Sequence, residues 1–186
     1  MPTFSLPLIA ALFLGTHVLA ATLGLRTPKT LNEAFGLGGT TAMTVLLAVP
    51  AYWAIDHLLL QPLGLHFLDT LIAVLSIATI AAVSETLLHN ALPQFFPLHG
   101  NLLPQIIVGA TIVALPLLQN DSLSFGTMLL QAFLFAGGTK LLTALFYTLR
   151  EHGAKAETPR VFRGPAIDML SAGLLVVALG GIASIF

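Results

Sequence analysis

Cysteine is absent from this 186-residue chain, and charged residues make up only 8% of it. Without thiols the chain has no disulfide, no thiolate metal site, no cysteine-ligated iron–sulfur cluster and no cysteine nucleophile of its own. Its formal net charge of −1 gives no general attraction for nucleic acid. Hydrophobic residues reach 56%, with a mean hydropathy of +0.95, which is more than a water-exposed surface tolerates. The composition therefore predicts a membrane protein in contact with lipid.

Apolar segments of roughly membrane-spanning length recur six times along the chain. A transmembrane helix needs about 20 mostly apolar residues. The first segment contains Val18-Leu19-Ala20, which resembles a signal-peptide cleavage site. No Lys or Arg precedes it, however, and its apolar run is too long for a signal peptide, so we interpret it as a helix. The predicted spans are residues 4–25, 36–60, 67–88, 102–119, 124–149 and 165–186.

The positions of Lys and Arg predict the orientation of these spans. Cations concentrate in the connection between spans one and two and in the one between spans five and six, and such loops are typically cytoplasmic. Both termini are then expected on the periplasmic side of a bacterial inner membrane. The connections in question carry Arg26 and Lys29, and Arg150, Lys155, Arg160 and Arg163, respectively.

A short pattern in span two returns in span five. Gly38-Gly39-Thr40 is followed by Thr44 and Leu46, and Gly137-Gly138-Thr139 is followed by Thr143 and Leu145. With three spans per half, the two spans cross the membrane in opposite directions. This arrangement predicts one integral membrane domain, residues 1–186, built from inverted-topology repeats at about 1–90 and 91–186. The alternative is that small residues recur by chance and only permit close helix packing.

Span four contains a feature that predicts a broken helix. The stretch LLPQIIVGATIV carries Pro104 and Gly109 within an otherwise apolar run. Proline removes a backbone donor and glycine loosens a helical turn. Inverted-repeat membrane proteins often have such broken helices near the midplane, supported by neighbouring protein. We therefore expect span four to enter the membrane as a half-helix.

The order of these motifs resembles a known family, the paired six-helix membrane subunits of the Rnf and Nqr electron-transport complexes, of the RnfA and NqrE type. The resemblance extends nearly from end to end and depends on the spacing of many individually weak matches. They are Leu23-Gly24-Leu25, Gly36-Leu37-Gly38, Trp53-Ala54-Ile55-Asp56, Pro62-Leu63, Glu85, Pro93, Gly100, Leu103-Pro104, Leu149-Arg150-Glu151, Phe162-Arg163-Gly164 and Ser171-Ala172-Gly173.

The resemblance implies pairing with a sister subunit of the RnfE or NqrD type, and a [2Fe–2S] cluster to which each partner contributes two cysteines. Here the first cysteine position falls on Arg26, or on Thr22 if the alignment slips, and the second falls on Ala110. None of these side chains can replace a thiolate as an iron ligand. We therefore expect this chain to hold neither its half of the cluster nor any other cofactor.

Four charged residues within the spans are candidates for an ion path or for buried charge. Lys140 and Asp168 are predicted to form a buried ion pair, because a lone charge in lipid is costly. Snorkelling of Lys140 towards the interface is the alternative. Asp56 and Glu85 match acidic positions of the family and are candidates for a cation path. The alternative is that they lie towards helix ends and reach lipid headgroups or cap a neighbouring helix.

No catalytic or metal-binding motif accompanies these charges. The six histidines have no ligand-like spacing, and no nucleophile elbow or phosphate loop is present. Two function classes remain. The first is a non-catalytic membrane subunit of an Rnf- or Nqr-type ion-translocating oxidoreductase. The second is a redox-silent relative that serves as an accessory, structural or transporter-like component of another membrane complex.

Overall fold

The computed structural model describes residues 6–23, 27–28, 30–91, 102–118, 124–155 and 165–183. Within these ranges the chain forms helices and no strand. Six main helices coincide with the six apolar segments, which confirms the prediction of an all-α membrane protein. Their bounds are α1 Leu6–Thr22, α2 Leu31–Ile55, α4 Asp69–Ala91, α5 Leu103–Leu118, α6 Phe125–Lys155 and α7 Pro165–Ala183.

The helix that contains α2 continues past Ile55 through an irregular stretch. A π-helical turn, η1 (Asp56–Leu60), leads into the short helix α3 (Gln61–Leu63), which ends at Gly64 with a left-handed φ of 65°. Glycine adopts that conformation without a Cβ clash. A 3-10 turn, η2 (His66–Leu68), then precedes α4. This end of the second span is therefore wider and less regular than an α-helix.

The start of α2 is fixed by a side-chain cap. The Thr30 hydroxyl accepts a hydrogen bond from the backbone N–H of Glu33 at 3.3 Å. Such a cap satisfies one of the free amides of the first turn. The helix consequently begins at Leu31 rather than at residue 36, where the apolar pattern placed it.

The helices fall into two length classes. The helix α5 has 16 residues and is about 24 Å long at helical rise, whereas a bilayer core is about 30 Å thick. Three helices are long and apolar enough to cross a membrane by length and composition, namely Leu31–Leu63, Asp69–Ala91 and Phe125–Gly153. The other three main helices are shorter: α1 has 17 residues, α5 has 16 and α7 has 19.

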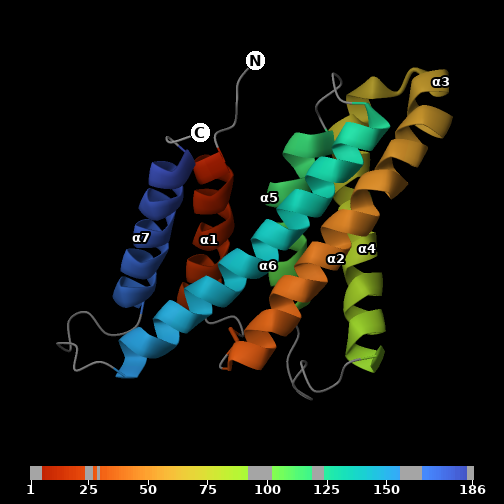
Figure 1. The fold of residues 1–186 in the computed structure, drawn as a ribbon. Coiled ribbons are helices and arrows are strands. Elements are labelled where there is room, and N and C mark those ends of the chain that lie inside the picture. Colours follow the sequence, from red (N-terminus) through yellow and green to blue (C-terminus); the bar gives the residue numbers. More distant parts are fainter. Residues whose placement is uncertain are drawn as a thin grey trace.

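Successive main helices run in alternating directions (Figure 1). The first turn of α1 and the last turn of α7 consequently lie on one face of the molecule, at the top of Figure 1. The ends of α1, α4 and α6 and the starts of α2, α5 and α7 lie on the opposite face. We call this opposite face the Arg150 face, because α6 carries Arg150 near that end.

The two longest helices, α2 and α6, pack against each other over much of their length, with α1 and α7 paired on one side and α4 and α5 on the other (Figure 1). Buried apolar side chains between these helices form two clusters. The first includes Phe13, Val45, Val49, Ile77 and Val113. The second lies towards the Arg150 face and includes Leu14, Leu37, Ile106, Phe146 and Ala172. Large apolar side chains also cover the outer surface, as expected for a chain surrounded by lipid.

A glycine permits the close approach of α2 and α6. A Cβ atom added to Gly38 would lie 3.2 Å from the Cα atom of Lys140 and 3.2 Å from the Cβ atom of Thr143. Nearby threonines keep their hydroxyls within their own helices: Thr44 donates to the Thr40 carbonyl and Thr143 to the Thr139 carbonyl, both at 2.8 Å. The threonine methyl groups are thereby free to pack across the interface.

We expect Gly38→Val to lower the free energy of unfolding in detergent by about 1–3 kcal/mol, the usual cost of overpacking a tight contact. The melting temperature should fall accordingly. Gly39→Val is the matched control, because a Cβ atom at Gly39 meets no atom within 4 Å. Melting temperatures of the two variants measured side by side provide the test. Equal losses at both positions would show that Gly38 has no special role in the α2–α6 contact.

The predicted break in span four is wrong for the part of this span that the structure describes. The helix α5 is continuous from Leu103 to Leu118. Pro104 lies in its first turn, where the missing N–H has no intrahelical partner to lose. Gly109 serves packing instead of a break, because a Cβ atom there would lie 3.1 Å from the Phe13 ring.

Candidate functional site

A buried ion pair joins α6 to α7 near the Arg150 face. The Arg150 Nε atom lies 3.1 Å from Asp168 Oδ1, and the side chains are 29% and 3% exposed. A carboxylate with so little solvent contact needs a nearby positive charge or hydrogen-bond donor. The guanidinium supplies both, so this pair fixes the start of α7 against the end of α6.

This contact corrects the predicted pairing of Lys140 with Asp168. Lys140 is exposed on the outer surface of α6, ten positions and about 15 Å before Arg150. The partner of Asp168 is Arg150, which the sequence pattern had assigned to the loop after span five because α6 was expected to end at residue 149 instead of Lys155. The exposure of Lys140 suits the alternative of snorkelling, which stays a prediction.

Aromatic rings extend the pair towards α1. The Arg150 Cζ atom lies 5.8 Å from the centre of the Tyr147 ring, one turn earlier on α6. The Tyr147 ring is in turn 5.9 Å, centre to centre, from the imidazole of His17 on α1. Phe13 and Phe146 also flank His17, at 4.9 Å and 5.9 Å between ring centres. Two helices, α1 and α6, thus place an imidazole, a phenol and a guanidinium next to one another.

Several polar atoms at this place are buried without a hydrogen-bond partner among the described protein groups. His17 Nδ1 lies 3.0 Å from the Phe13 carbonyl, so Nδ1 donates and Nε2 is left as an acceptor. The Tyr147 hydroxyl faces the Gln105 amide and the Arg150 guanidinium, but none of these contacts has ordinary hydrogen-bond geometry. The orphan atoms are His17 Nε2, Gln105 Nε2, Gln105 Oε1 and the Tyr147 hydroxyl oxygen.

We call His17, Gln105, Tyr147, Arg150 and Asp168 the polar cluster. A pocket of about 330 Å³ adjoins it on the Arg150 face. The pocket shares Tyr147 and Arg150 with the polar cluster, and the segment before α2 forms its opposite wall. Its other lining residues are Thr27, Pro28, Thr30, Leu31 and Glu151. The polar cluster is therefore next to an open pocket on the Arg150 face that has both polar and apolar lining residues.

The other predicted ion-path residues lie elsewhere and make local contacts. Asp56, in η1, accepts a hydrogen bond from Gln61 at 2.8 Å and lies 3.4 Å from His57, at the end of α2 opposite the Arg150 face. Glu85, on α4, faces the backbone N–H of Leu102 just before α5. This arrangement suits the alternative of helix capping, because a carboxylate is favourable at a helix start. Of the four predicted charges, the structure places Asp168 alone in the polar cluster.

The positions aligned with the family's cluster cysteines do not offer iron ligands where the structure describes them. Ala110 is fully buried in the apolar core around Phe13 and Val113. Thr22 is exposed at the end of α1 and donates its hydroxyl to the Leu19 carbonyl at 2.9 Å. Arg26 lies outside the described residues. No group of three His, Cys, Asp or Glu side chains suited to a metal ion occurs in the described ranges.

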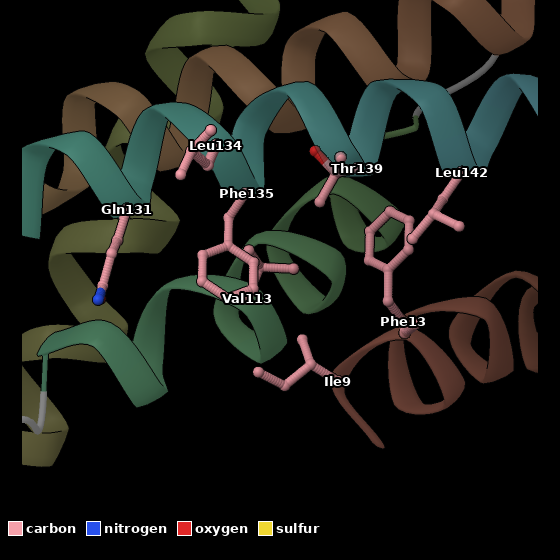
Figure 2. Close-up of a pocket in the computed structure, with 10 residues that line it drawn as sticks. Ile9, Phe13, Val113, Gln131, Leu134, Phe135, Thr139 and Leu142 are labelled. Atoms are coloured by element: carbon pink, nitrogen blue, oxygen red, sulfur yellow. The ribbon is translucent and has the colours of Figure 1, made fainter. Parts of the chain in front are cut away.

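A second, apolar pocket of about 180 Å³ lies between α1, α5 and α6. Figure 2 shows Ile9 and Phe13 of α1 and Val113 of α5 on the side facing α6. Gln131 lies at one end of the pocket and Leu142 at the other, along α6. Because its walls are almost entirely hydrocarbon, this pocket offers space for apolar chains and no group for chemistry.

His17, Gln105 and Tyr147 were not predicted as site residues from the sequence. The histidines were set aside because they lack ligand-like spacing, although the His17 ring is buried inside the helix bundle. The available signal was a polar side chain within an otherwise apolar span, which is expensive in lipid and often functional. Their proximity could not be predicted, because they come from three helices far apart in the sequence.

Comparison with known proteins agrees with this architecture. A family model described as an Rnf-Nqr subunit, membrane protein, matches residues 3–186. A protein of Edwardsiella ictaluri, named as one of the subunits of an ion-translocating oxidoreductase complex, is 33% identical, over 97% of this chain and 96% of that protein. Proteins of the same name from Vibrio campbellii and Yersinia enterocolitica are 31% and 32% identical, over 97% of this chain and 97% and 96% of theirs. This chain therefore belongs to the Rnf-Nqr family of membrane subunits.

Proposed function

We propose that this chain is an integral membrane subunit of an Rnf/Nqr-type ion-translocating electron transport complex and that it holds no redox cofactor itself. Its relatives are named as subunits of ion-translocating oxidoreductase complexes. The observation that carries the proposal is a family match over nearly the whole chain in a sequence that has no cysteine. Electrons would then pass through other subunits, while this chain contributes helices and polar groups within the membrane.

The proposed architecture is a pair of inverted repeats, with α1, α2 and α4 in the first half and α5, α6 and α7 in the second. Equivalent helices run in opposite directions (Figure 1). In this relation α1 corresponds to α5, α2 to α6 and α4 to α7. The helix contacts agree with it, because α1 packs on α7 as α5 packs on α4, and α2 packs on α4 as α6 packs on α7. This pattern supports a twofold relation between residues 1–90 and 91–186.

The proposed partner is a sister six-helix subunit of the RnfE or NqrD type. The complex would lie in a bacterial inner membrane, with both termini of this chain in the periplasm and the Arg150 face in the cytoplasm. The cations at the end of α6 and beyond support that orientation. A polar cluster on the cytoplasmic side would then be available to an ion-translocating assembly.

Asp56→Asn and Glu85→Gln are expected to leave ion flux through the complex unchanged, because each carboxylate makes a local contact near a helix end. Each amide variant keeps the side-chain shape and removes one charge. Ion flux in vesicles containing the complex is the measurement. A loss of flux with normal complex assembly would assign the affected carboxylate to the ion path.

Affinity purification of the tagged chain from native membranes, with identification of its partners, tests the proposed function. We expect co-purification of an RnfE- or NqrD-like protein together with further subunits of the same complex. The alternative function is favoured by the residues at the former cysteine positions, such as the buried Ala110. Recovery of subunits from a different respiratory or photosynthetic complex, without the sister subunit, would contradict the proposal and support that alternative.

A further inference from the structure

Four buried polar atoms of the polar cluster have no protein partner within the described residues, and this is costly in a membrane interior. They belong to His17 on α1, Gln105 on α5 and Tyr147 on α6. Buried polar groups are nearly always satisfied by protein or by ordered water. Three neighbouring side chains from three helices all lack a hydrogen-bond partner, which indicates a common ligand.

The donors and acceptors at this place identify the class of that ligand. His17 Nε2 accepts, the Gln105 amide both donates and accepts, and the Tyr147 hydroxyl does either. The carboxylate of Asp168 is engaged by Arg150, so no free anionic group remains in the polar cluster to hold a metal ion. A small neutral molecule that donates and accepts in several directions satisfies all four atoms. Water has these properties.

The adjoining pocket supplies a route for water. Its volume of about 330 Å³ is large compared with the roughly 30 Å³ that one water occupies in the liquid. Tyr147 and Arg150 line the pocket and belong to the polar cluster. Thr27, Thr30 and Glu151 give the pocket further polar groups.

We propose that the pocket and the polar cluster form a hydrated inlet, which brings water from the Arg150 face into the membrane as far as His17. The inlet closes at the rings of Phe13 and Phe146, which flank His17 and are almost fully buried. Beyond them the core around Val45 and Val113 is apolar. The inlet thus leads part of the way across the membrane and does not form a continuous pore.

Labelling of single cysteines tests the inlet directly, because the natural chain has no thiol that would react in the background. His17→Cys and Gln105→Cys would be made in the full chain, reconstituted in vesicles of known orientation. A small, charged, membrane-impermeant methanethiosulfonate would then be added to one side at a time. The cysteine thiolate attacks the sulfenyl sulfur of such a reagent, which forms a mixed disulfide and releases methanesulfinate, and the thiolate forms in water and not in a dry core.

Both variants are expected to react from the Arg150 face at least about tenfold faster than Ala110→Cys, because thiol reactivity follows access to water. Ala110 is the matched buried control, since it lies in the apolar core of the same helix as Gln105. His152→Cys, exposed near the end of α6, reports full access to that face. Labelling rates as slow as that of Ala110→Cys, or equal labelling rates from the two sides of the membrane, would contradict the proposed inlet.

Tyr147→Phe provides a second measurement that does not depend on how a cysteine variant folds. If the tyrosine hydroxyl binds water in the inlet, its removal is expected to leave the melting temperature unchanged or slightly lower. If the hydroxyl is dry and unpartnered, its removal relieves a desolvation cost and the melting temperature rises. A clear rise would therefore contradict the proposal.

The inlet rests on the geometry of this chain alone and not on the proposed assembly. Labelling is measured on the isolated chain, whereas membership in an Rnf/Nqr-type complex is measured by partner identification. Failure of either experiment therefore leaves the other conclusion in place.

Discussion

Arg150→Met is expected to destabilise the protein strongly, by about 3–5 kcal/mol, because it leaves the carboxylate of Asp168 buried without its counter-charge. Methionine keeps much of the apolar stem of arginine, so the lost charge and its hydrogen bond dominate the effect. Thermal unfolding in a mild detergent, followed by helical circular dichroism, measures the loss.

Lys140→Met on the same helix is the matched control for this prediction. Lys140 is exposed and is not the partner of Asp168, so its replacement should change the stability by little. Asp168→Asn combined with Arg150→Met should recover part of the loss, because the buried charge is then removed with its partner. A larger loss for Lys140→Met than for Arg150→Met would contradict the ion pair described here.

Phe146→Ala is expected to cost about 3–5 kcal/mol, the usual effect of truncating a fully buried aromatic ring. The Phe146 side chain is 1% exposed, belongs to the apolar cluster near the Arg150 face and has its ring centre 5.9 Å from that of His17. The truncation would leave a cavity between α1 and α6 that the surrounding helices can fill only in part. The same detergent unfolding assay measures the effect.

Phe133→Ala makes the same chemical change at a position on α6 that is 65% exposed. In a membrane or a detergent micelle this ring faces hydrocarbon, so its loss is expected to cost much less. A large loss at Phe133 together with a small loss at Phe146 would show that α6 is rotated relative to the orientation described here.

The number of main helices and their positions could be predicted from the sequence, because each needs a long apolar segment and the connections between them are short. Some helix ends could not be predicted from hydropathy. The helix α2 begins at Leu31 because Thr30 caps it, and α6 continues to Lys155 although its last turns are polar. At the start of α2 a local hydrogen bond therefore sets a helix end that the apolar pattern alone does not mark.

The error in the predicted ion pair has a geometric cause. Lys140 and Arg150 are ten positions apart on α6, which turns their side chains about 80° from each other around the helix axis. Which of the two faces Asp168 depends on how α6 packs on α7, and spacing within one helix does not contain that information. For the same reason the polar cluster became visible only when four helices were placed together.

The predicted break in span four failed for a different reason. A proline disrupts a helix interior but is tolerated in the first turn, and the start of α5 at Leu103 puts Pro104 in that turn. The position of the helix was predicted correctly, but the role of the proline was not. Residue type alone does not distinguish a proline that breaks a helix from one that begins it.

Iron and acid-labile sulfide, measured on the purified chain once its partners have been removed with stringent detergent, test most directly the claim that it holds no redox cofactor. The absence of cysteine and the buried methyl group of Ala110 predict neither element above the background of a mock preparation. Iron and sulfide in equal amounts, stoichiometric with the isolated chain, would contradict the account.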